Sequence, residues 1–351
     1  MRLRLPFVVM TIGFAAATAA AQDNGDGTTR VMVREALRSA APAGRAYQGR
    51  DRGPEQTERF SRKVRIGRDG RVSIENIAGN ITVTGGSGDE VSIEAVKRTR
   101  RERSELGSVQ IIVDERPGRV DIRTEHARTF NRQGGDGVSV DYTVTVPNSA
   151  AVDLKSISGN VKVSNVQGGV RAESISGNVT TAGTPRLELA KSVSGDVDLT
   201  DASADADLTA SSISGSIRAK GLKARSLELG TVSGDVSLVD VSCDRLGAKS
   251  ISGNVEYSGS LARNGRYEVN SHSGTIRLTL SGSTGFELTA TSFSGTIRSE
   301  LPLTIGGDRD QNVSGRGRRG PGNRSIRATF GDGSAALIVR TFSGDVVIAK
   351  K

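Results

Sequence analysis

One six-residue phrase recurs along this 351-residue chain, and it constrains the fold more than any other feature of the sequence. The phrase reads Ser or Thr, a residue that is usually apolar, Ser-Gly, a small polar or acidic residue, and Val or Ile. Successive copies lie 18 to 21 residues apart, and this period predicts a repeat architecture in which each unit packs on its neighbours. The eight copies of the array begin at Ser156, Ser174, Ser192, Ser212, Thr231, Ser250, Ser271 and Ser292.

The fourth position of the phrase is always glycine. A glycine at a fixed place in every unit predicts a turn that needs either positive φ or a close approach between neighbouring units. We therefore expect these glycines to have a structural role. They are Gly159, Gly177, Gly195, Gly215, Gly234, Gly253, Gly274 and Gly295, with Gly344 in a last copy near the C-terminus.

Between the glycines, Val, Ile and Leu alternate with Thr, Ser and charged residues, which is the pattern of β-strands. Each unit has room for about two short strands and two turns. Two all-β folds fit this pattern. In a parallel β-helix or β-solenoid each unit is one coil, and coils stack at roughly 4.8 Å. In an antiparallel repeat meander, Ser-Gly-Asn/Asp would be a hairpin turn.

The residue after each glycine favours the solenoid. In a solenoid these residues form one column, in which no two carboxylates are neighbours. That spacing is expected because like charges repel at ~4.8 Å, whereas amides and hydroxyls pair along a stack. The column is Asn160, Asn178, Asp196, Ser216, Asp235, Asn254, Thr275 and Thr296.

The rest of the chain divides around this array. Residues 1–21 have the basic start, apolar stretch and Ala-rich end of a cleavable signal peptide, which predicts a periplasmic or secreted protein without a transmembrane segment in the mature chain. Residues 22–58 are expected to be a flexible polar lead-in, and residues 59–150 atypical β coils. Residues 151–300 hold the regular repeats, 301–324 a basic Gly/Arg-rich loop, and 325–351 a C-terminal coil and cap that ends the solenoid.

Positive charge is concentrated in two segments. The formal net charge is +9, and removal of Arg2 and Arg4 with the signal peptide leaves +7, all of it in Lys97–Arg103 and Gly306–Arg324. Such patches attract anionic surfaces, although the simpler interpretation is a solvated edge and loop that keep the protein soluble. Nucleic acid is not expected, because neither segment contains aromatic residues. Candidate contacts to an anionic partner are Arg316, Arg318, Arg319 and Arg324.

No catalytic, metal or cofactor motif is recognisable, and no cofactor is expected. A β-helical polysaccharide-acting enzyme would need paired carboxylates, and Asp196 and Asp235 would lie about 9–10 Å apart across two coils. The absence of Trp and the 3% of aromatic residues argue against sugar binding by stacking. Cys243, the single cysteine, is expected to be a buried small residue, and His272 a partly buried ring. Asp332 lies in a Gly-Asp-Gly turn without a calcium-repeat motif.

Three segments resemble a bacterial family of adhesin-like β-strand repeat proteins of unknown function, the toast-rack domains. They are the S-[IV]-S-G-[DN]-[VI] units, the entry phrase Val72–Ile81 (VSIENIAGNI) and the final Thr341–Val346 (TFSGDV). The resemblance implies right-handed β-helical modules of the cell envelope, some linked to envelope stress, and offers no catalytic residues. We thus expect a non-enzymatic envelope module with an adhesin-like or scaffold role. Its partner would be an envelope protein or an anionic polysaccharide or lipid surface.

Overall fold

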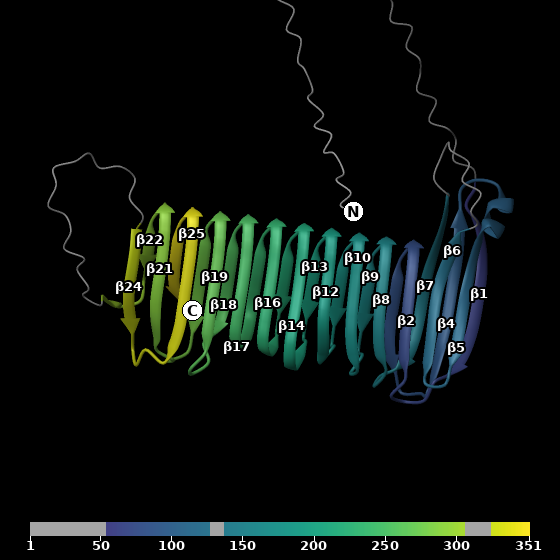
Figure 1. Cartoon of the computed structure of the whole chain (residues 1–351), viewed down its shortest axis with the longest axis horizontal. Helices are drawn as coiled ribbons and strands as arrows, with labels where there is room; N and C mark the ends of the chain where they lie inside the picture. Colours follow the sequence, from purple (N-terminus) through teal and green to yellow (C-terminus); the bar gives the residue numbers. More distant parts are fainter. Residues whose placement is uncertain (1–53, 127–136, 306–323) are drawn as a thin grey trace, which may run out of the picture. The chain divides into compact units, whose positions relative to one another are not determined.

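The structure is a computed structural model that describes residues 54–126, 137–305 and 324–351. The compact unit Arg52–Lys351 is a β-solenoid in which two long sheets, A and B, enclose one core (Figure 1). This confirms the predicted solenoid and rules out a meander in the array. The hand of the coil stays a prediction. The predicted signal peptide and most of the predicted lead-in lie outside the described residues, and the first described strand begins at Gln56, inside the predicted lead-in.

Sheet B holds the strands that lead into the phrase. From the N-terminal end its order is β5 (Val109–Arg116), β6 (Arg119–His126), β2 (Arg71–Ala78), β8 (Ala151–Ser158), β10 (Gly169–Ser176), β12 (Arg186–Ser194), β14 (Ser203–Ser214), β16 (Lys223–Ser233), the second part of β17 (Val236–Ser252), β19 (Arg266–Ser273), β25 (Ala335–Ser343), β21 (Phe286–Ser294), β24 (Arg324–Phe330) and β23 (Thr304–Ile305).

Sheet A holds the strands that leave the phrase. Its order is β1 (Gln56–Arg65), β4 (Glu90–Thr99), β7 (Val138–Pro147), β3 (Ile81–Gly86), β9 (Val161–Ser164), β11 (Val179–Ala182), β13 (Val197–Thr200), β15 (Ile217–Lys220), the first part of β17, β18 (Val255–Ser260), β20 (Ile276–Ser281), β26 (Val346–Lys350) and β22 (Ile297–Ser299). A 3-10 helix, Arg103–Ser108, follows β4.

Within the array the strands pair in parallel, and the phrase of each coil lies on the phrase of the next. Ser156 pairs with Ser174, and Ser174 with Ser192. The Val or Ile that closes the phrase points into the core, where all its copies from Val161 to Ile276, and Val346, are fully buried. The phrase is therefore the corner at which the chain passes from sheet B to sheet A.

The last copy of the phrase does not end the solenoid, so that part of the sequence prediction is wrong. Strand β25 pairs on one side with β19 and on the other with β21, which precedes it in the sequence (Figure 1). The C-terminal coil is thus inserted between the coils of Ser271 and Ser292. The order is also permuted at the other end, where β6 and β7 lie outside β2 and β3.

Antiparallel strands cover both ends of the solenoid. Strands β1, β4 and β5 do so at the N-terminal end, and β24 pairs antiparallel with β21 at the other. Such atypical terminal units protect strand edges that could pair with other chains. The N-terminal part, where atypical coils were predicted, therefore consists of two stacked coils, β2–β3 and β6–β7, and the antiparallel strands that cover them.

Candidate functional site

The phrase glycines form one column along the solenoid, and they are needed for close approach. Their spatial order is Gly79, Gly159, Gly177, Gly195, Gly215, Gly234, Gly253, Gly274, Gly344 and Gly295. A Cβ on any of them after Gly79 would overlap the carbonyl oxygen of the preceding glycine. The sequence suggested either positive φ or close approach between units as the reason for a fixed glycine, and close approach is the reason that applies throughout the column.

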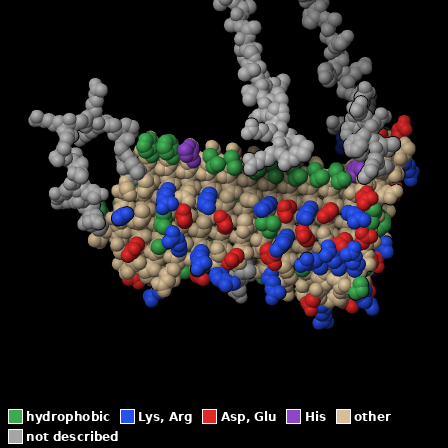
Figure 2. Space-filling model, viewed as in Figure 1, with side chains coloured by type: hydrophobic (Ala, Val, Ile, Leu, Met, Phe, Trp, Pro, Cys, Tyr) green, Lys and Arg blue, Asp and Glu red, His purple; other side chains and the backbone are tan. Residues whose placement is uncertain are grey.

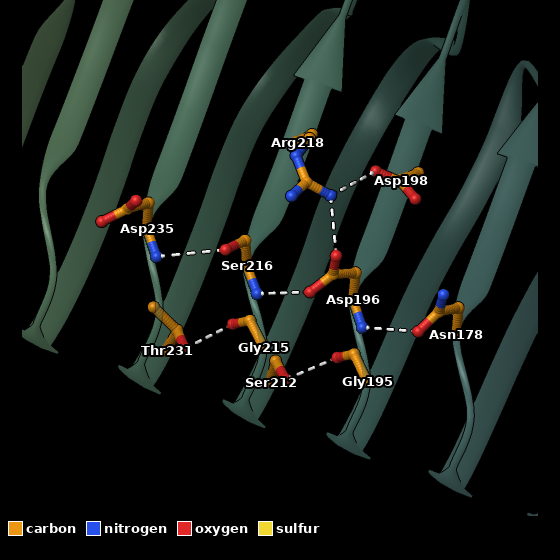
Figure 3. Close-up of polar contacts among 10 residues, drawn as sticks. All are labelled: Asn178, Gly195, Asp196, Asp198, Ser212, Gly215, Ser216, Arg218, Thr231 and Asp235. Atoms are coloured by element: carbon orange, nitrogen blue, oxygen red, sulfur yellow. Dashed lines mark hydrogen bonds and ion pairs between the residues drawn. The ribbon is translucent and has the colours of Figure 1, made fainter.

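The first residue of each phrase points inward, and from Ser174 onward its hydroxyl donates to a glycine carbonyl of the neighbouring coil. Ser174 donates to the Gly159 oxygen at 2.9 Å and Ser192 to the Gly177 oxygen at 2.8 Å. Figure 3 shows the same bond from Ser212 to Gly195 and from Thr231 to Gly215. A buried carbonyl left without a donor would be costly, so this hydroxyl fixes the orientation of the phrase.

The residues after the glycines form the predicted column, and most of them pair with backbone. In these the side-chain oxygen accepts a hydrogen bond from the backbone N–H of the next residue in the column, as Asn178 does from Asp196 at 2.9 Å and Asp196 from Ser216 at 2.8 Å (Figure 3). Two side chains also pair directly, because the Thr296 hydroxyl donates to Asp345 at 2.8 Å. Asp345 joins the column between Thr275 and Thr296, so no two carboxylates are adjacent there either.

The two carboxylates considered for catalysis lie two coils apart, with Ser216 between them, as the sequence predicted (Figure 3). Asp196 forms a 2.8 Å ion pair with Arg218, which also reaches Asp198 at 3.3 Å. The Arg218 guanidinium and the Ser216 N–H hold the pKa of Asp196 below its usual range. Asp196 is therefore ionised at neutral pH and unsuited to donating a proton.

The second residue of the phrase points outward, and its copies form a continuous apolar row along one long edge of the solenoid (Figure 2). Nine large apolar side chains in this row are 37% to 52% exposed. They are nine of the eleven exposed large apolar side chains among the described residues, so their exposure is not random scatter. We call the row the apolar ridge: Ile77, Ile157, Ile175, Val193, Ile213, Val232, Ile251, His272, Phe342 and Phe293, in spatial order.

Aromatic rings form the C-terminal end of the apolar ridge. His272 stacks on Phe342 with ring centres 4.9 Å apart, and Phe342 stacks on Phe293 at 4.7 Å. The prediction of a partly buried His272 is wrong, because this side chain is exposed like the other residues of the ridge. The inserted coil supplies the middle ring, so the three-ring stack forms only when β25 is in place.

A second row runs beside the ridge, two residues earlier on each strand of sheet B. We call it the flanking row: Arg123, Glu75, Lys155, Glu173, Lys191, Ser211, Gly230, Lys249, Asn270, Arg340 and Thr291, in spatial order. Its charges alternate in sign from Arg123 to Lys191, and beyond Ser211 they are only positive. Lys249 and Arg340 make exposed ion pairs with Glu228 and Glu268, at 3.6 and 3.4 Å.

Ridge and flanking row line two grooves that follow the edge of the solenoid. One of about 700 Å³ extends from Ile77 to Ile213 and is bordered by Glu75, Lys155 and Glu173. The other, of about 520 Å³, lies beside Ile251 and the aromatic stack. The buried hydroxyls of the phrase line both grooves. This edge can bind a partner by burial of apolar surface, with the charges setting its register.

Sequence reasoning missed this edge, although a signal for it was present. Strand residues two apart share a face, and the residues two positions before the ridge include Lys155, Glu173, Lys191 and Lys249. Charged residues at those positions are expected to face solvent, and the apolar residue two positions later lies on the same face, so it should be outside too. The inward position goes to Ser or Thr because the glycine carbonyl needs a donor.

The predicted basic contacts are only partly described. Arg316, Arg318 and Arg319 lie outside the described residues, and Arg324 begins β24, opposite Ser292. In the other basic segment, several charges are paired: Lys97 with Glu58 at 3.0 Å, Arg98 with Asp141 at 2.9 Å and Arg101 with Glu105 at 3.8 Å. This segment offers less unpaired charge than its composition suggests.

Two other residues singled out from the sequence, Cys243 and Asp332, have structural roles. Cys243 is 3% exposed, and burial raises the pKa of its thiol to about 12. Asp332 accepts hydrogen bonds from the backbone of Gly285 and Ser334, which lowers its pKa and fixes the turn before β25. Across the described residues, no cluster of three or more His, Cys, Asp or Glu could hold a metal ion. No helix in this part of the chain is both long and apolar enough to span a bilayer.

The fold and this edge define a β-solenoid repeat protein with a linear contact surface. The chain belongs to the Toastrack DUF4097 family, which it matches over residues 73–348. This confirms the family suggested by the repeated phrase. A search of curated proteins found no significant match.

Three solved structures are similar to this chain. A "putative adhesin" from Bacteroides fragilis NCTC 9343 is 11% identical, with 84% of this chain and 97% of that chain covered and a TM-score of 0.40. A "putative lipid binding protein" from Parabacteroides distasonis ATCC 8503 is 12% identical, with coverage of 84% and 97% and a TM-score of 0.35. A "putative cell adhesion protein" from Clostridium sporogenes ATCC 15579 is 9% identical, with coverage of 84% and 100% and a TM-score of 0.22. At these values the likeness carries no argument about function.

Proposed function

We propose that this chain is a non-enzymatic module exported to the cell envelope, where it has an adhesin-like or scaffold role in the envelope-stress context that the family resemblance implies. The observation that carries the proposal is the apolar ridge. Contiguous apolar surface of this extent is uncommon on a soluble monomer and marks a contact site. The ridge contributes little to the core, because its side chains are about half exposed.

The solenoid suits a contact role because it holds the ridge on rigid strands. Each ridge residue lies between two inward or corner residues whose hydrogen bonds connect neighbouring coils, as Ile213 does between Ser212 and Ser214. A preformed surface loses little conformational entropy when it binds. Export, and with it a site of action in the periplasm or outside the cell, is supported by the signal-peptide pattern of residues 1–21.

Envelope binding tests this role. The purified chain, residues 22–351, is mixed with isolated envelopes of the source organism, and the co-sedimenting fraction is measured. Ile175→Asp with Ile251→Asp should abolish binding, while Val239→Asp, an exposed apolar position away from the ridge, should leave it unchanged. Equal binding by all three proteins contradicts the proposed contact surface.

The competing function is a β-helical polysaccharide-acting enzyme, and its test is cleavage. We expect no release of reducing ends from a panel of envelope polysaccharides. Cleavage that disappears in Asp196→Asn or Asp235→Asn, but persists in Ser237→Ala, would replace the non-enzymatic proposal. The ion pair of Asp196 with Arg218 supports the expectation of no cleavage.

The basic segment Gly306–Arg324 carries a separate proposal, contact with an anionic polysaccharide or lipid surface. Its support is the local charge of five Arg against two Asp. Replacement of Arg316, Arg318 and Arg319 by Ser should weaken binding to such a surface and flatten its dependence on salt. Binding that is unchanged by these substitutions excludes the segment as a contact. No nucleic-acid partner is proposed.

A further inference from the structure

We propose that the partner on the apolar ridge is a second copy of this chain, bound with its solenoid axis antiparallel to the first. The inference rests on the proposed contact role of the ridge and names its occupant. Its observations are the spacing of the ridge, the sequence of charges in the flanking row and the area available.

The spacing of the ridge favours another solenoid of the same kind. The ridge presents one side chain per coil, so its residues recur at roughly 4.8 Å over a length of roughly 43 Å. A partner must present apolar side chains at the same interval to stay in register over that length. A second copy does so without adjustment. A strip of this length needs a width of only about 19 Å to reach the roughly 800 Å² per partner of a standard interface.

Two-fold symmetry leaves two ways to place one ridge on the other. If the solenoid axes run in the same direction, the two flanking rows lie on opposite sides of the contact. If the axes run in opposite directions, the flanking rows face each other. Only the antiparallel pairing brings the charged residues of both rows together, so it is the arrangement that the charges can select.

The antiparallel register in which the two rows overlap over their full length pairs opposite charges and contains no like-charge pair. When the two-fold axis passes through the coil of Ser211 and Ile213, Glu75 faces Arg340 of the second copy and Glu173 faces Lys249. Symmetry repeats each pair. The other charged residues of the row, Arg123, Lys155 and Lys191, face the neutral Thr291, Asn270 and Gly230.

A shift by one coil loses this match. In one direction Lys155 would face Arg340 and Lys191 would face Lys249, and in the other Lys155 would face Lys249 and Arg123 would face Arg340. Opposed like charges are unfavourable, so the row disfavours a shift by one coil in either direction. The Glu75 and Glu173 carboxylates form no ion pair with the residues that the structure describes, and they are available for this contact.

The same register gives reasonable apolar pairs along the ridge. Ile213 lies on its symmetry mate at the axis, Val193 faces Val232, and Ile175 faces Ile251. Ile77 meets Phe342 at the outer end. A continuous bilayer is a less suitable occupant, because it presents no fixed charges that could select among the registers compared above.

The mass in solution is the first test. Sedimentation velocity of the chain 22–351 should give twice the monomer mass, and Ile213→Asp, which opposes two carboxylates at the axis, should give the monomer. Val239→Asp should remain a dimer. A monomeric wild-type chain, or an Ile213→Asp dimer, overturns the proposal. A monomer that sediments with phosphatidylglycerol vesicles through the ridge would make lipid the occupant.

A charge exchange tests the register even if an apolar variant fails to fold. Arg340→Glu or Glu75→Arg alone should raise the dimer dissociation constant about tenfold, since each creates two like-charge pairs. The combination Glu75→Arg with Arg340→Glu should restore the wild-type constant. A combination that dimerises no better than the single variants overturns the register.

Crosslinking locates the axis. Ser211→Cys should form a disulfide-linked dimer on mild oxidation, whereas Ser237→Cys, on the outer face of sheet A, should not. Cys243 does not compete, because it is buried. If the wild-type chain is monomeric but Ile175→Asp with Ile251→Asp still loses envelope binding, the second-copy inference fails and the proposed function stands.

Discussion

At the scale of single residues, the phrase glycines are required by carbonyl oxygens one coil away. The obstacle to a larger residue is backbone, which cannot move aside as a flexible side chain would. Some other glycines of the array, such as Gly247, have no such neighbour. At Gly230, on strand β16, nothing lies within 4 Å of a Cβ. A comparison of a phrase glycine with Gly230 therefore distinguishes the effect of close packing between coils from a general intolerance of the strands to substitution.

Gly195→Ala should destabilise the protein by about 2 kcal/mol or more, because the new methyl group forces two coils apart. Gly230→Ala should change the free energy of unfolding by less than about 0.5 kcal/mol. Urea denaturation followed by circular dichroism measures both. Equal effects at the two positions would show that close approach is not the reason for the glycine column.

Alkaline pH should destabilise the fold through its buried acids. Burial raises the pKa of Cys243 from 9.0 to about 12, and those of Tyr142 and Tyr267 from 10.0 to about 12. In the unfolded chain these groups ionise first, so the unfolded state binds fewer protons and stability falls as pH rises. The loss should begin near pH 9 and continue to about pH 12.

The measurement is the urea midpoint as a function of pH. Cys243→Ala should remove the part of the decline that begins near pH 9 and leave the part near pH 10. A midpoint that stays constant from neutral pH to above pH 10 would contradict the assignment of these groups as neutral and buried.

At the scale of elements, the polar column connects coils through backbone N–H groups and tolerates carboxylates only when they are separated. Asn, Asp and Ser all supply the accepting oxygen, which explains much of the mixed composition of the column. Ser216 lies between Asp196 and Asp235. It is therefore the position where an added charge has the clearest effect.

Ser216→Asp should lower the melting temperature at low salt, because it places three carboxylates in a row at ~4.8 Å spacing. Added salt should recover part of the loss. Ser216→Asn keeps the accepting oxygen without the charge, and it should melt near the wild type at every salt concentration. A loss of equal size in both variants would indicate a steric effect.

Substitutions in the ridge should change the stability of the fold much less than substitutions in the core. Ile175→Ser should change stability by less than about 1 kcal/mol, because its side chain is half exposed. Leu154→Ala, at a fully buried position, should cost about 2–5 kcal/mol. Thermal unfolding compares them. A large loss for Ile175→Ser would make the ridge part of the stability of the fold.

Much of the structure of one coil was predictable from sequence. The repeat period predicted the solenoid, and the residues after the glycines predicted the polar column, because both follow from local patterns in the sequence. The ridge was missed because Ser-Ile-Ser suggests a buried Ile between polar residues. Its true orientation depends on a hydrogen bond from Ser to a carbonyl of another coil, as from Ser174 to Gly159, and no local pattern contains that bond.

At the scale of the whole molecule, the order of coils could not be predicted. All copies of the phrase are nearly alike, so the sequence does not distinguish a last coil that is terminal from one that is inserted between Ser271 and Ser292. The choice depends on end strands such as β24, which pairs antiparallel with β21 on the side away from β25 and so leaves no edge of β21 for another coil.

A chain that ends at Phe330 should lose order only near its C-terminal end. Each coil contacts its neighbours alone, so coils far from the missing β25 and β26 keep their partners. Limited proteolysis should cut within Phe286–Ser299 and spare Ala151–Ser252. A chain with residues 306–323 replaced by a short Gly-Ser linker should resist cleavage throughout. Uniform cleavage of the truncated chain would show that the solenoid unfolds as one unit.

The inserted coil also bears on how the protein is made. Synthesis proceeds from the N-terminus, so the segment that separates β19 from β21 emerges after both of them. Until Ala335–Lys350 arrives, the preceding coils cannot adopt their final neighbours, and the three-ring stack is incomplete. An interrupted chain therefore presents an unfinished edge that proteases can recognise. The architecture thus makes the arrival of this late segment a condition for the final order of the coils.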